Sequence, residues 1–319
     1  PVEPAKPEDT LRIVGLGDSY AFGWGVGQQQ NYLAFLEQSL GRLLPDRRVE
    51  VLNMGCPGFS SWNEAAIFEE LGMQFAPDLV LIQYNINDAT LPLFLTRRDY
   101  LLRFDRIYLL QLTDVLRSGL DQLLDREAGP QWNPRRIIFQ QNAPQTNDPA
   151  EIPPELRHMV GEQGVRNAYR RLAELCHERG IPLLVLIPTE SAWAFLPEAD
   201  HDPHFDWIRG LCAELDLKAV ETFPGDHAFM LGLGEGASDD LLFVDAPNDW
   251  HPSVIRHSLW AQSALPQVAR ALAGDRISTP ALQNELDRLR EENDQRVRQW
   301  HAAPPDKAAP AIPSGDSEE

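Results

Sequence analysis

Short apolar runs alternate with longer amphipathic stretches along most of the chain. The run at 79–84 (LVLIQY) is continuous and uncharged, and the run at 182–187 (PLLVLI) repeats this pattern. Such runs are typical of strands that helices cover on both faces. Between the runs, apolar residues recur at helical spacing. We predict strands at 12–16, 49–53, 79–84, 182–187 and, with a weaker pattern, 218–223. We predict helices at 29–44, 62–75, 155–179, 205–215 and 253–272.

The alternation of strands and helices predicts an α/β fold. Strands that read as buried on both faces favour a parallel sheet with helices on each side, joined by right-handed crossovers. In an open parallel sheet, functional groups gather at the carboxyl ends of the strands. We therefore look for chemistry in the segments that follow each predicted strand.

The same pattern divides the chain into four parts. Residues 1–10 (PVEPAKPEDT) are Pro-rich and charged, and we interpret them as a linker or tether. A domain is predicted at 11–275, with a long insertion at about 90–155 that is either a lid or a packing helix with a surface loop. Residues 276–301 are predicted to form an amphipathic helix that docks on the domain. The acidic, Pro-rich tail at 302–319 is predicted to be disordered.

Charge and hydropathy restrict the class of partner. The formal net charge is −20 and the sequence pI is about 4.7. Nucleic acids are bound through clustered Lys and Arg, so the composition argues against a nucleic-acid partner. No apolar run reaches the length of about 18 residues that a membrane span needs. The compartment stays open: the sequence fits an exported or membrane-tethered protein whose N-terminal segment is missing, and it also fits a cytoplasmic protein. The sequence also leaves the oligomeric state open.

The three cysteines do not indicate a metal or redox motif. None of them has CxxC spacing. Cys176 and Cys212 fall in helical apolar patterns and are predicted to lie in the core. Cys56 is interpreted as a small packing residue.

Polar segments follow the first three predicted strands, and the first two of these segments contain glycine. Gly17-Asp18-Ser19 follows the first, where a serine that opens a helix can turn its hydroxyl and its backbone N–H toward a cleft. The segment 53–58 follows the second, and glycine there lets a backbone N–H approach a ligand closely. The segment 85–88 (NIND) follows the third, and an Asn amide offers N–H donors to an oxyanion.

A fourth polar segment, 244–253 (VDAPNDWHPS), precedes the last predicted helix of the domain. A histidine within two or three residues of an acid can act as a general base that the carboxylate orients. Each of the four segments alone is also typical of a turn or a helix cap. Together they follow separate elements at the positions expected for the rim of one active site.

In this order the four segments resemble the sequence blocks of the SGNH, or GDSL-like, hydrolases, over roughly residues 11–272. The resemblance implies that Ser19 is the nucleophile and His251 the general base. It implies that Ser19, Gly58 and Asn87 supply the N–H donors of an oxyanion hole. It also implies a three-layer α/β/α sandwich of the flavodoxin-like type with about five parallel strands.

Two positions depart from the pattern of that family. The common spacing before the histidine is Asp-x-x-His, whereas this chain has Asn248 at that position and Asp249 one residue later. We therefore expect Asp249 to be the acid of the triad, with Asp245 as the alternative. The third block usually begins with Gly, and Asn85 stands there instead.

The resemblance implies two-step acyl transfer without a metal ion or other cofactor. The leading hypothesis is a serine esterase acting on an acyl ester, acetyl among the candidates, of a glycan, lipid or small alcohol. One alternative is an O-acyltransferase that uses the same triad. The other is a non-catalytic binding or assembly module on the same fold.

Three further groups were weighed. Trp24 and Trp62 follow the first two blocks and are candidate substrate-binding residues, with core or rim packing as the alternative reading. His201, His204 and Asp206 lie close together in the sequence. We assign them no metal site, because the implied chemistry needs none.

Overall fold

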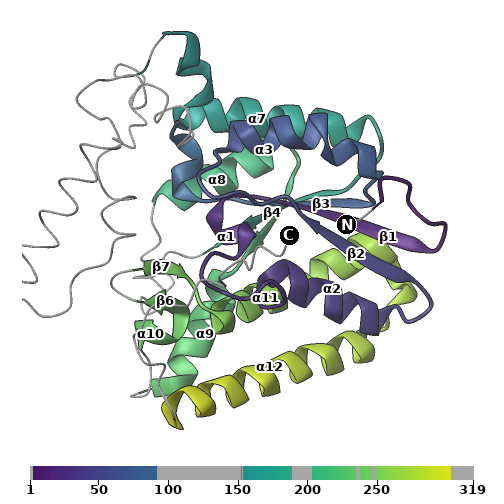
Figure 1. Ribbon diagram of the computed structural model, residues 1–319, viewed down its shortest axis with the longest axis vertical. Helices are drawn as coiled ribbons and strands as arrows, with labels where there is room; N and C mark the ends of the chain where they lie inside the picture. Colours follow the sequence, from purple (N-terminus) through teal and green to yellow (C-terminus); the bar gives the residue numbers. More distant parts are fainter. Residues whose placement is uncertain are drawn as a thin grey trace, which may run out of the picture.

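The computed structural model describes residues 3–91, 152, 154–188, 203–234, 238–245 and 249–302. Its centre is a five-stranded sheet in the order β2-β1-β3-β4-β5, with parallel pairing between neighbours (Figure 1). This sheet confirms the predicted α/β class. The strands are β1 (Thr10–Leu16), β2 (Arg48–Asn53), β3 (Leu79–Gln83), β4 (Leu183–Ile187) and β5 (Lys218–Glu221).

Consecutive residues of the central strands face opposite helical layers. Ile13 and Leu81 belong to one hydrophobic core, and Val14 and Ile82 to the other, as the two-residue period of a strand requires. The sheet is therefore the middle of three layers (Figure 1). One outer layer contains α2 (Tyr32–Leu43), α11 (Val254–Ala273) and α12 (Thr279–Ala302), and the other contains α3 (Ser61–Glu70), α7 (Gly161–His177) and α8 (Pro203–Glu214).

Local chemistry moves some element boundaries away from the predicted ones. Helix α2 begins at Tyr32, because the Asn31 side chain accepts the N–H of Ala34 at 2.9 Å and caps the helix. The predicted strand at 218–223 ends at Glu221. Pro224 lies in the first turn of α9 (Phe223–Leu233), a helix that the sequence pattern did not predict. The short elements are α1 (Ser19–Phe22), α10 (Asp239–Leu242), η1 (Gly72–Phe75), η2 (Ile86–Ala89), η5 (Pro154–Met159) and η8 (Gly274–Arg276).

A two-stranded antiparallel hairpin lies outside the main sheet and was not predicted. It consists of β6 (Phe243–Asp245) and β7 (Asp249–Pro252). Strands this short do not show a readable two-residue alternation. The buried guanidinium of Arg256 supports the hairpin from α11, because it lies 4.7 Å from the Phe243 ring centroid and pairs with buried Asp226 at 3.2 Å.

The N-terminal segment folds back on the domain. The buried guanidinium of Arg12 donates to the carbonyls of Glu3 and Pro4, each at 2.8 Å, and pairs with Glu50 at 2.7 Å. A guanidinium offers five N–H donors in a fixed plane, so it can hold several acceptors at once. The described part of the predicted linker is thus docked against the sheet, and Thr10 already belongs to β1.

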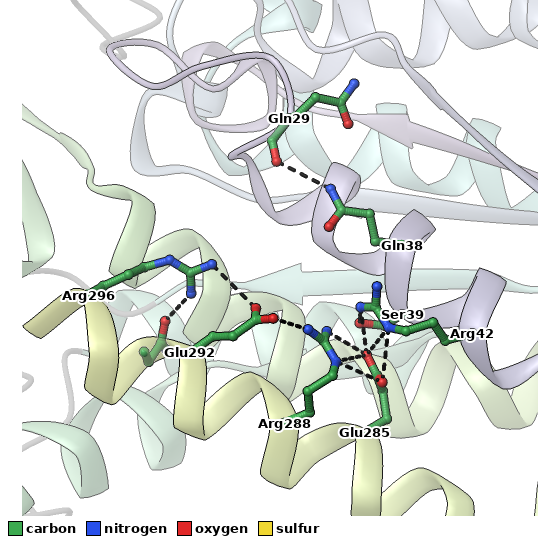
Figure 2. Close-up of polar contacts among 9 residues, drawn as sticks. Gln29, Gln38, Ser39, Arg42, Glu285, Arg288, Glu292 and Arg296 are labelled. Atoms are coloured by element: carbon green, nitrogen blue, oxygen red, sulfur yellow. Dashed lines mark hydrogen bonds and ion pairs between the residues drawn. The ribbon is translucent and has the colours of Figure 1, made fainter.

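Helix α12 covers the outer side of α2 and α11 (Figure 1). Its Leu289 and Val297 are buried. Polar side chains also join it to α2: Glu285 accepts from Arg42 of α2 at 2.8 Å and from Arg288 of α12 at 2.7 Å (Figure 2). The α2–α12 ion-pair network consists of Arg42, Glu285, Arg288, Glu292 and Arg296.

Several predictions concern residues that the structure does not describe. Most of the insertion predicted at about 90–155 lies outside the described residues, as do the tail after residue 302 and Asn248. Cys176 and Cys212 are buried, as predicted. Among the described helices, none combines the length and the apolar character that a bilayer span requires.

Candidate active site

Ser19 opens α1 at the carboxyl end of β1. The turn before it needs glycine, because Gly17 has φ 151° and a Cβ there would lie 2.6 Å from the Ala21 Cβ. Asp18 caps the helix, and its Oδ1 accepts the N–H of Tyr20 at 2.9 Å. Ser19 is therefore the first helical residue, and its own N–H belongs to the first turn, where backbone donors have no partner within the helix.

His251 reaches Ser19 from β7. Its Nε2 lies 2.9 Å from the Ser19 Oγ, and its Nδ1 lies 2.5 Å from the Asp249 Oδ1. Burial alone would raise the pKa of Asp249, but the hydrogen bonds and charge of His251 outweigh it and hold that pKa below its ordinary value. The three side chains form a continuous Ser–His–Asp series.

The β6–β7 hairpin explains how an Asp-x-His spacing brings the carboxylate of Asp249 to the imidazole of His251. Residues two apart on a strand point to the same side, so Asp249 and His251 of β7 share one face. The N–H of His251 also donates to Asp249 Oδ1, at 3.0 Å. Asp245, the alternative acid, lies opposite Asp249 on β6. The structure thus places Asp249 in hydrogen-bond contact with His251.

Two aromatic side chains near the nucleophile flank the imidazole of His251. The Tyr20 ring lies 5.5 Å from it, edge to face, and the Trp24 ring lies 6.0 Å away at a tilt. The Tyr20 hydroxyl donates to the carbonyl of Trp250 at 3.3 Å and so joins α1 to β7. Trp24 therefore lies beside the imidazole of His251.

Trp62 has different surroundings. Its ring lies 4.7 Å from the ring of His158, edge to face, and it packs on a small core that includes Leu91, Ile152 and Met159. Such contacts fit the alternative interpretation of Trp62, in which it packs in the core or at the rim of the domain. They join α3 to the segment that precedes α7.

Gly58 and Asn87 come from the two neighbouring strands. Gly58 has φ 81° in the loop between β2 and α3. That loop is attached to the turn before Ser19, because the Cys56 N–H donates to the Gly17 carbonyl at 3.1 Å. Asn87 lies on η2 after β3, and its Nδ2 donates to Asp18 Oδ2 at 2.8 Å. The four predicted blocks therefore meet at the carboxyl edge of the sheet.

Asp18 is a central residue that sequence reasoning missed. It is fully buried, and its Oδ2 accepts from Asn85 as well as from Asn87, at 2.9 and 2.8 Å. The Ser19 Oγ lies 3.4 Å from the same oxygen. Its position beside the nucleophile was visible in the sequence, but its partners are 67 and 69 residues away. Asn85 was noted only as a departure from the family pattern.

Two more buried carboxyl groups lie behind this edge. Burial, then the charges of Asp88 and Asp18, raise the pKa of Glu64 well above its ordinary value. Burial and the charge of Asp18 likewise raise the pKa of Asp88, although the N–H of Asn85 opposes the shift. Both groups therefore retain a proton to higher pH than exposed carboxyls do.

The residues at 201–206 that lie close together in the sequence are described only in part. His201 and Asp202 lie outside the described residues, as does the side chain of His204. In the part of the chain that the structure describes, no group of three or more His, Cys, Asp or Glu side chains is arranged to hold a metal ion.

Several solved structures are similar to this chain at low sequence identity. Axe2, an acetylxylan esterase from Geobacillus stearothermophilus, is 16% identical over 84% of this chain and 97% of its own, with a TM-score of 0.46. TesA is 15% identical over 82% of this chain and 99% of its own, with a TM-score of 0.44. A two-domain esterase active on acetylated mannans is 13% identical over 82% of this chain and 50% of its own, with a TM-score of 0.45. No curated protein matches the sequence significantly.

The comparison with family models covers the whole candidate site. The model of the GDSL-like Lipase/Acylhydrolase family matches residues 16–259. The matched range contains Ser19, Gly58, Asn87 and His251, together with all the main-sheet strands that follow β1. The resemblance found in the sequence is therefore confirmed: the chain belongs to the GDSL-like lipase/acylhydrolase family.

Proposed function

We propose that this protein is a serine esterase that hydrolyses a carboxylic ester, with Ser19 as nucleophile, His251 as general base and Asp249 as supporting acid. The observation that carries the proposal is the double contact of His251, whose Nε2 lies 2.9 Å from Ser19 Oγ while Nδ1 lies 2.5 Å from Asp249 Oδ1. Membership of an acylhydrolase family supports an ester as the bond that is cleaved.

In the first step, Ser19 Oγ attacks the carbonyl carbon of the ester and its proton passes to Nε2 of His251. Asp249 accepts the Nδ1–H, which keeps Nε2 unprotonated before the attack and stabilises the imidazolium afterwards. The imidazolium then protonates the departing alkoxide. The alcohol leaves, and the acyl group remains bound to Ser19.

In the second step, water takes the place of the alcohol. His251 removes a proton from the water as its oxygen bonds to the acyl carbon. The tetrahedral intermediate collapses, the bond to Ser19 Oγ breaks, and the proton returns to Ser19. The products are a carboxylic acid and free enzyme. Protein side chains supply both the nucleophile and the base, so the proposed reaction is metal-independent.

We assign the oxyanion of both tetrahedral intermediates to three N–H donors. The N–H of Ser19 belongs to the first turn of α1, and that of Gly58 lies in the adjoining loop. The Asn87 amide has two N–H groups, so its bond to Asp18 leaves the second for the oxyanion. Each donor of this kind is worth about 3–4 kcal/mol of transition-state stabilisation.

Trp24 is proposed to border the bound ester, because its ring stands beside His251. The proposal covers an acyl group, acetyl among the candidates, on a glycan, lipid or small alcohol. Some of the fold neighbours act on acetylated glycans, and p-nitrophenyl acetate is therefore a suitable first substrate.

Ser19→Ala tests the proposal. Because the hydroxyl is the attacking group, kcat for p-nitrophenyl acetate is expected to fall by about 10³-fold or more, and labelling by a fluorophosphonate to disappear. Ser263→Ala is the matched control, since this hydroxyl donates within α11, to the Leu259 carbonyl at 3.1 Å. Unchanged turnover in Ser19→Ala would overturn the assignment.

The same assay separates the two alternatives. A non-catalytic module would neither turn over the ester nor react with the fluorophosphonate. An O-acyltransferase would require Ser19 but would form acylated alcohol in preference to free acid when an acceptor such as glycerol or xylose is added. Measuring both products in one reaction distinguishes transfer from hydrolysis.

A further inference from the structure

Asn85 has a fixed orientation between η2 and the turn before Ser19. Its Oδ1 accepts the N–H of Ile86 at 2.7 Å, and its Nδ2 donates to Asp18 Oδ2 at 2.9 Å. Its backbone N–H donates to Asp88 Oδ2 at 3.0 Å. Two side-chain hydrogen bonds and one backbone hydrogen bond therefore hold Asn85, and none of them is to a residue that the proposed mechanism places against substrate.

The oxygen that Asn85 contacts is shared by three donors. Asn87 Nδ2 lies 2.8 Å from Asp18 Oδ2, Asn85 Nδ2 lies 2.9 Å from it, and Ser19 Oγ lies 3.4 Å from it. A carboxylate oxygen has two lone pairs, so two short amide bonds fill its capacity. The hydroxyl of Ser19 is left with the longest of the three contacts.

Ser19 has one proton and two acceptors within reach. His251 Nε2 lies 2.9 Å from its oxygen, and Asp18 Oδ2 lies 3.4 Å away. Hydrogen bonds to an ionised acceptor are stronger than those to a neutral one, so a carboxylate oxygen with spare capacity would compete with the imidazole. A hydroxyl that donates to Asp18 directs its proton away from the base and cannot be activated by it.

We propose that Asn85 is a positioning residue for the proton of Ser19. Together with Asn87 it fills Asp18 Oδ2, so that the hydroxyl of Ser19 donates to His251. The inference rests on the proposed esterase mechanism and adds a residue to it. Asn85 acts through Asp18 and Ser19, and it contacts neither the substrate nor the oxyanion.

Asn85→Ala is the primary test. It removes one of the two amide donors from Asp18 Oδ2, and the loss of one hydrogen bond to a charged group corresponds to about a tenfold decrease in kcat. KM for p-nitrophenyl acetate is expected to change by less than twofold, because binding groups are untouched. The rate of fluorophosphonate labelling should fall in parallel with kcat. A crystal structure of the variant should show Ser19 Oγ at ordinary hydrogen-bond distance from Asp18.

Two controls separate positioning from general loosening of η2. Thr90→Val removes the hydroxyl that donates to the Asn87 carbonyl at 2.7 Å, at the other end of η2, and kcat should stay within twofold. In an Asp18→Asn background the competing charge is absent while the helix cap is preserved, since Asn caps as well as Asp. There Asn85→Ala should change kcat or the labelling rate by less than twofold.

Three results would overturn the inference. They are an Asn85→Ala variant with kcat within twofold of the wild type, the same tenfold loss in the Asp18→Asn background, and an equal loss in Thr90→Val. If Ser19→Ala also keeps its turnover, the proposed function itself fails. If Ser19→Ala is inactive and Asn85→Ala is neutral, only the positioning role of Asn85 fails.

Discussion

Two buried carboxylates in this molecule are held by different kinds of donor. Asp18, beside the nucleophile, accepts from the side-chain amides of Asn85 and Asn87. Glu285, in the α2–α12 ion-pair network, is 6% exposed and accepts from the guanidinium groups of Arg42 and Arg288 (Figure 2). The donors to Asp18 are neutral amides that follow the end of β3. The donors to Glu285 are positively charged groups on two helices, α2 and α12.

The difference shows what each arrangement can do. Neutral amides specify direction: they decide which lone pairs of Asp18 are filled, and hence where the proton of Ser19 points. Guanidinium groups supply opposite charge, and they hold α12 on α2 whatever the detailed geometry of the site. We therefore expect changes around Asp18 to alter kcat and changes around Glu285 to alter the free energy of unfolding.

The largest effect is expected at the third member of the triad. Asp249→Asn should lower kcat by about 10³-fold with little change in KM, because the variant favours the wrong tautomer of His251. Asp245→Asn is the matched control on the opposite strand of the hairpin, and its kcat should stay within about threefold. Steady-state kinetics with p-nitrophenyl acetate measures both. If kcat falls further in Asp245→Asn than in Asp249→Asn, Asp245 rather than Asp249 is the acid of the triad.

Glu285→Gln tests the other side of the comparison. Removal of this charge should lower the free energy of unfolding by about 2 kcal/mol, because Arg42 and Arg288 both lose their ion pair with Glu285. The melting temperature should fall by roughly 5 °C while kcat changes by less than twofold. Calorimetry and the esterase assay on the same sample give both values. A loss of kcat without a loss of stability would contradict the separation drawn here.

The pKa of Glu285 determines how the stability difference between the wild type and Glu285→Gln depends on pH. Burial would raise that pKa, but the hydrogen bonds from Arg288 and Arg42 outweigh it and lower the pKa to about 2. A depressed pKa contributes stability that is present above the ordinary value of 4.5 and is lost as pH falls through about 2. The stability difference between wild type and Glu285→Gln should therefore shrink between pH 4.5 and pH 2. A constant difference over that range would contradict the assigned role.

The smallest effect is expected farther along α12. Glu292 pairs with Arg288 and Arg296 within the helix, and its side chain is 36% exposed. Pairs of this kind are worth about 0.5 kcal/mol, so Glu292→Gln should move the melting temperature by less than about 2 °C. Thermal unfolding at low and high salt checks this value. A fall as large as that of Glu285→Gln would show that the whole network, rather than Glu285, holds α12.

Sequence pattern predicted the scaffold well for a physical reason. Strands β3 and β4 are uncharged and buried throughout, and helices cover both of their faces. Burial on two faces restricts such strands to mainly apolar residues. The order of the polar segments after them was also readable, because parallel strands bring their carboxyl ends to one edge. The segments that contain Ser19, Asn87 and His251 could be found in this way, and the resemblance to the SGNH hydrolases then singled out these three residues.

The details of the site could not be read in the same way. Asp249 was preferred to Asp245, but the reason lies in a hairpin whose strands are only three and four residues long. Trp24 and Trp62 have similar positions in the sequence, each shortly after one of the first two polar segments. In the structure, however, Trp24 lies beside His251 and Trp62 packs against His158. Helix α9 replaced the end of a predicted strand because Pro224 starts a helix there.

The sequence by itself therefore determined the layers of the fold, the edge at which its polar segments meet and the residue types available there. Only the tertiary structure decided which carboxylate bonds to His251, and that the amides of Asn85 and Asn87 converge on one oxygen of Asp18. Periodicity reports burial, which is a property of each segment. Hydrogen-bond partners that are 67 and 69 residues apart depend on distances that arise only when the strands are side by side.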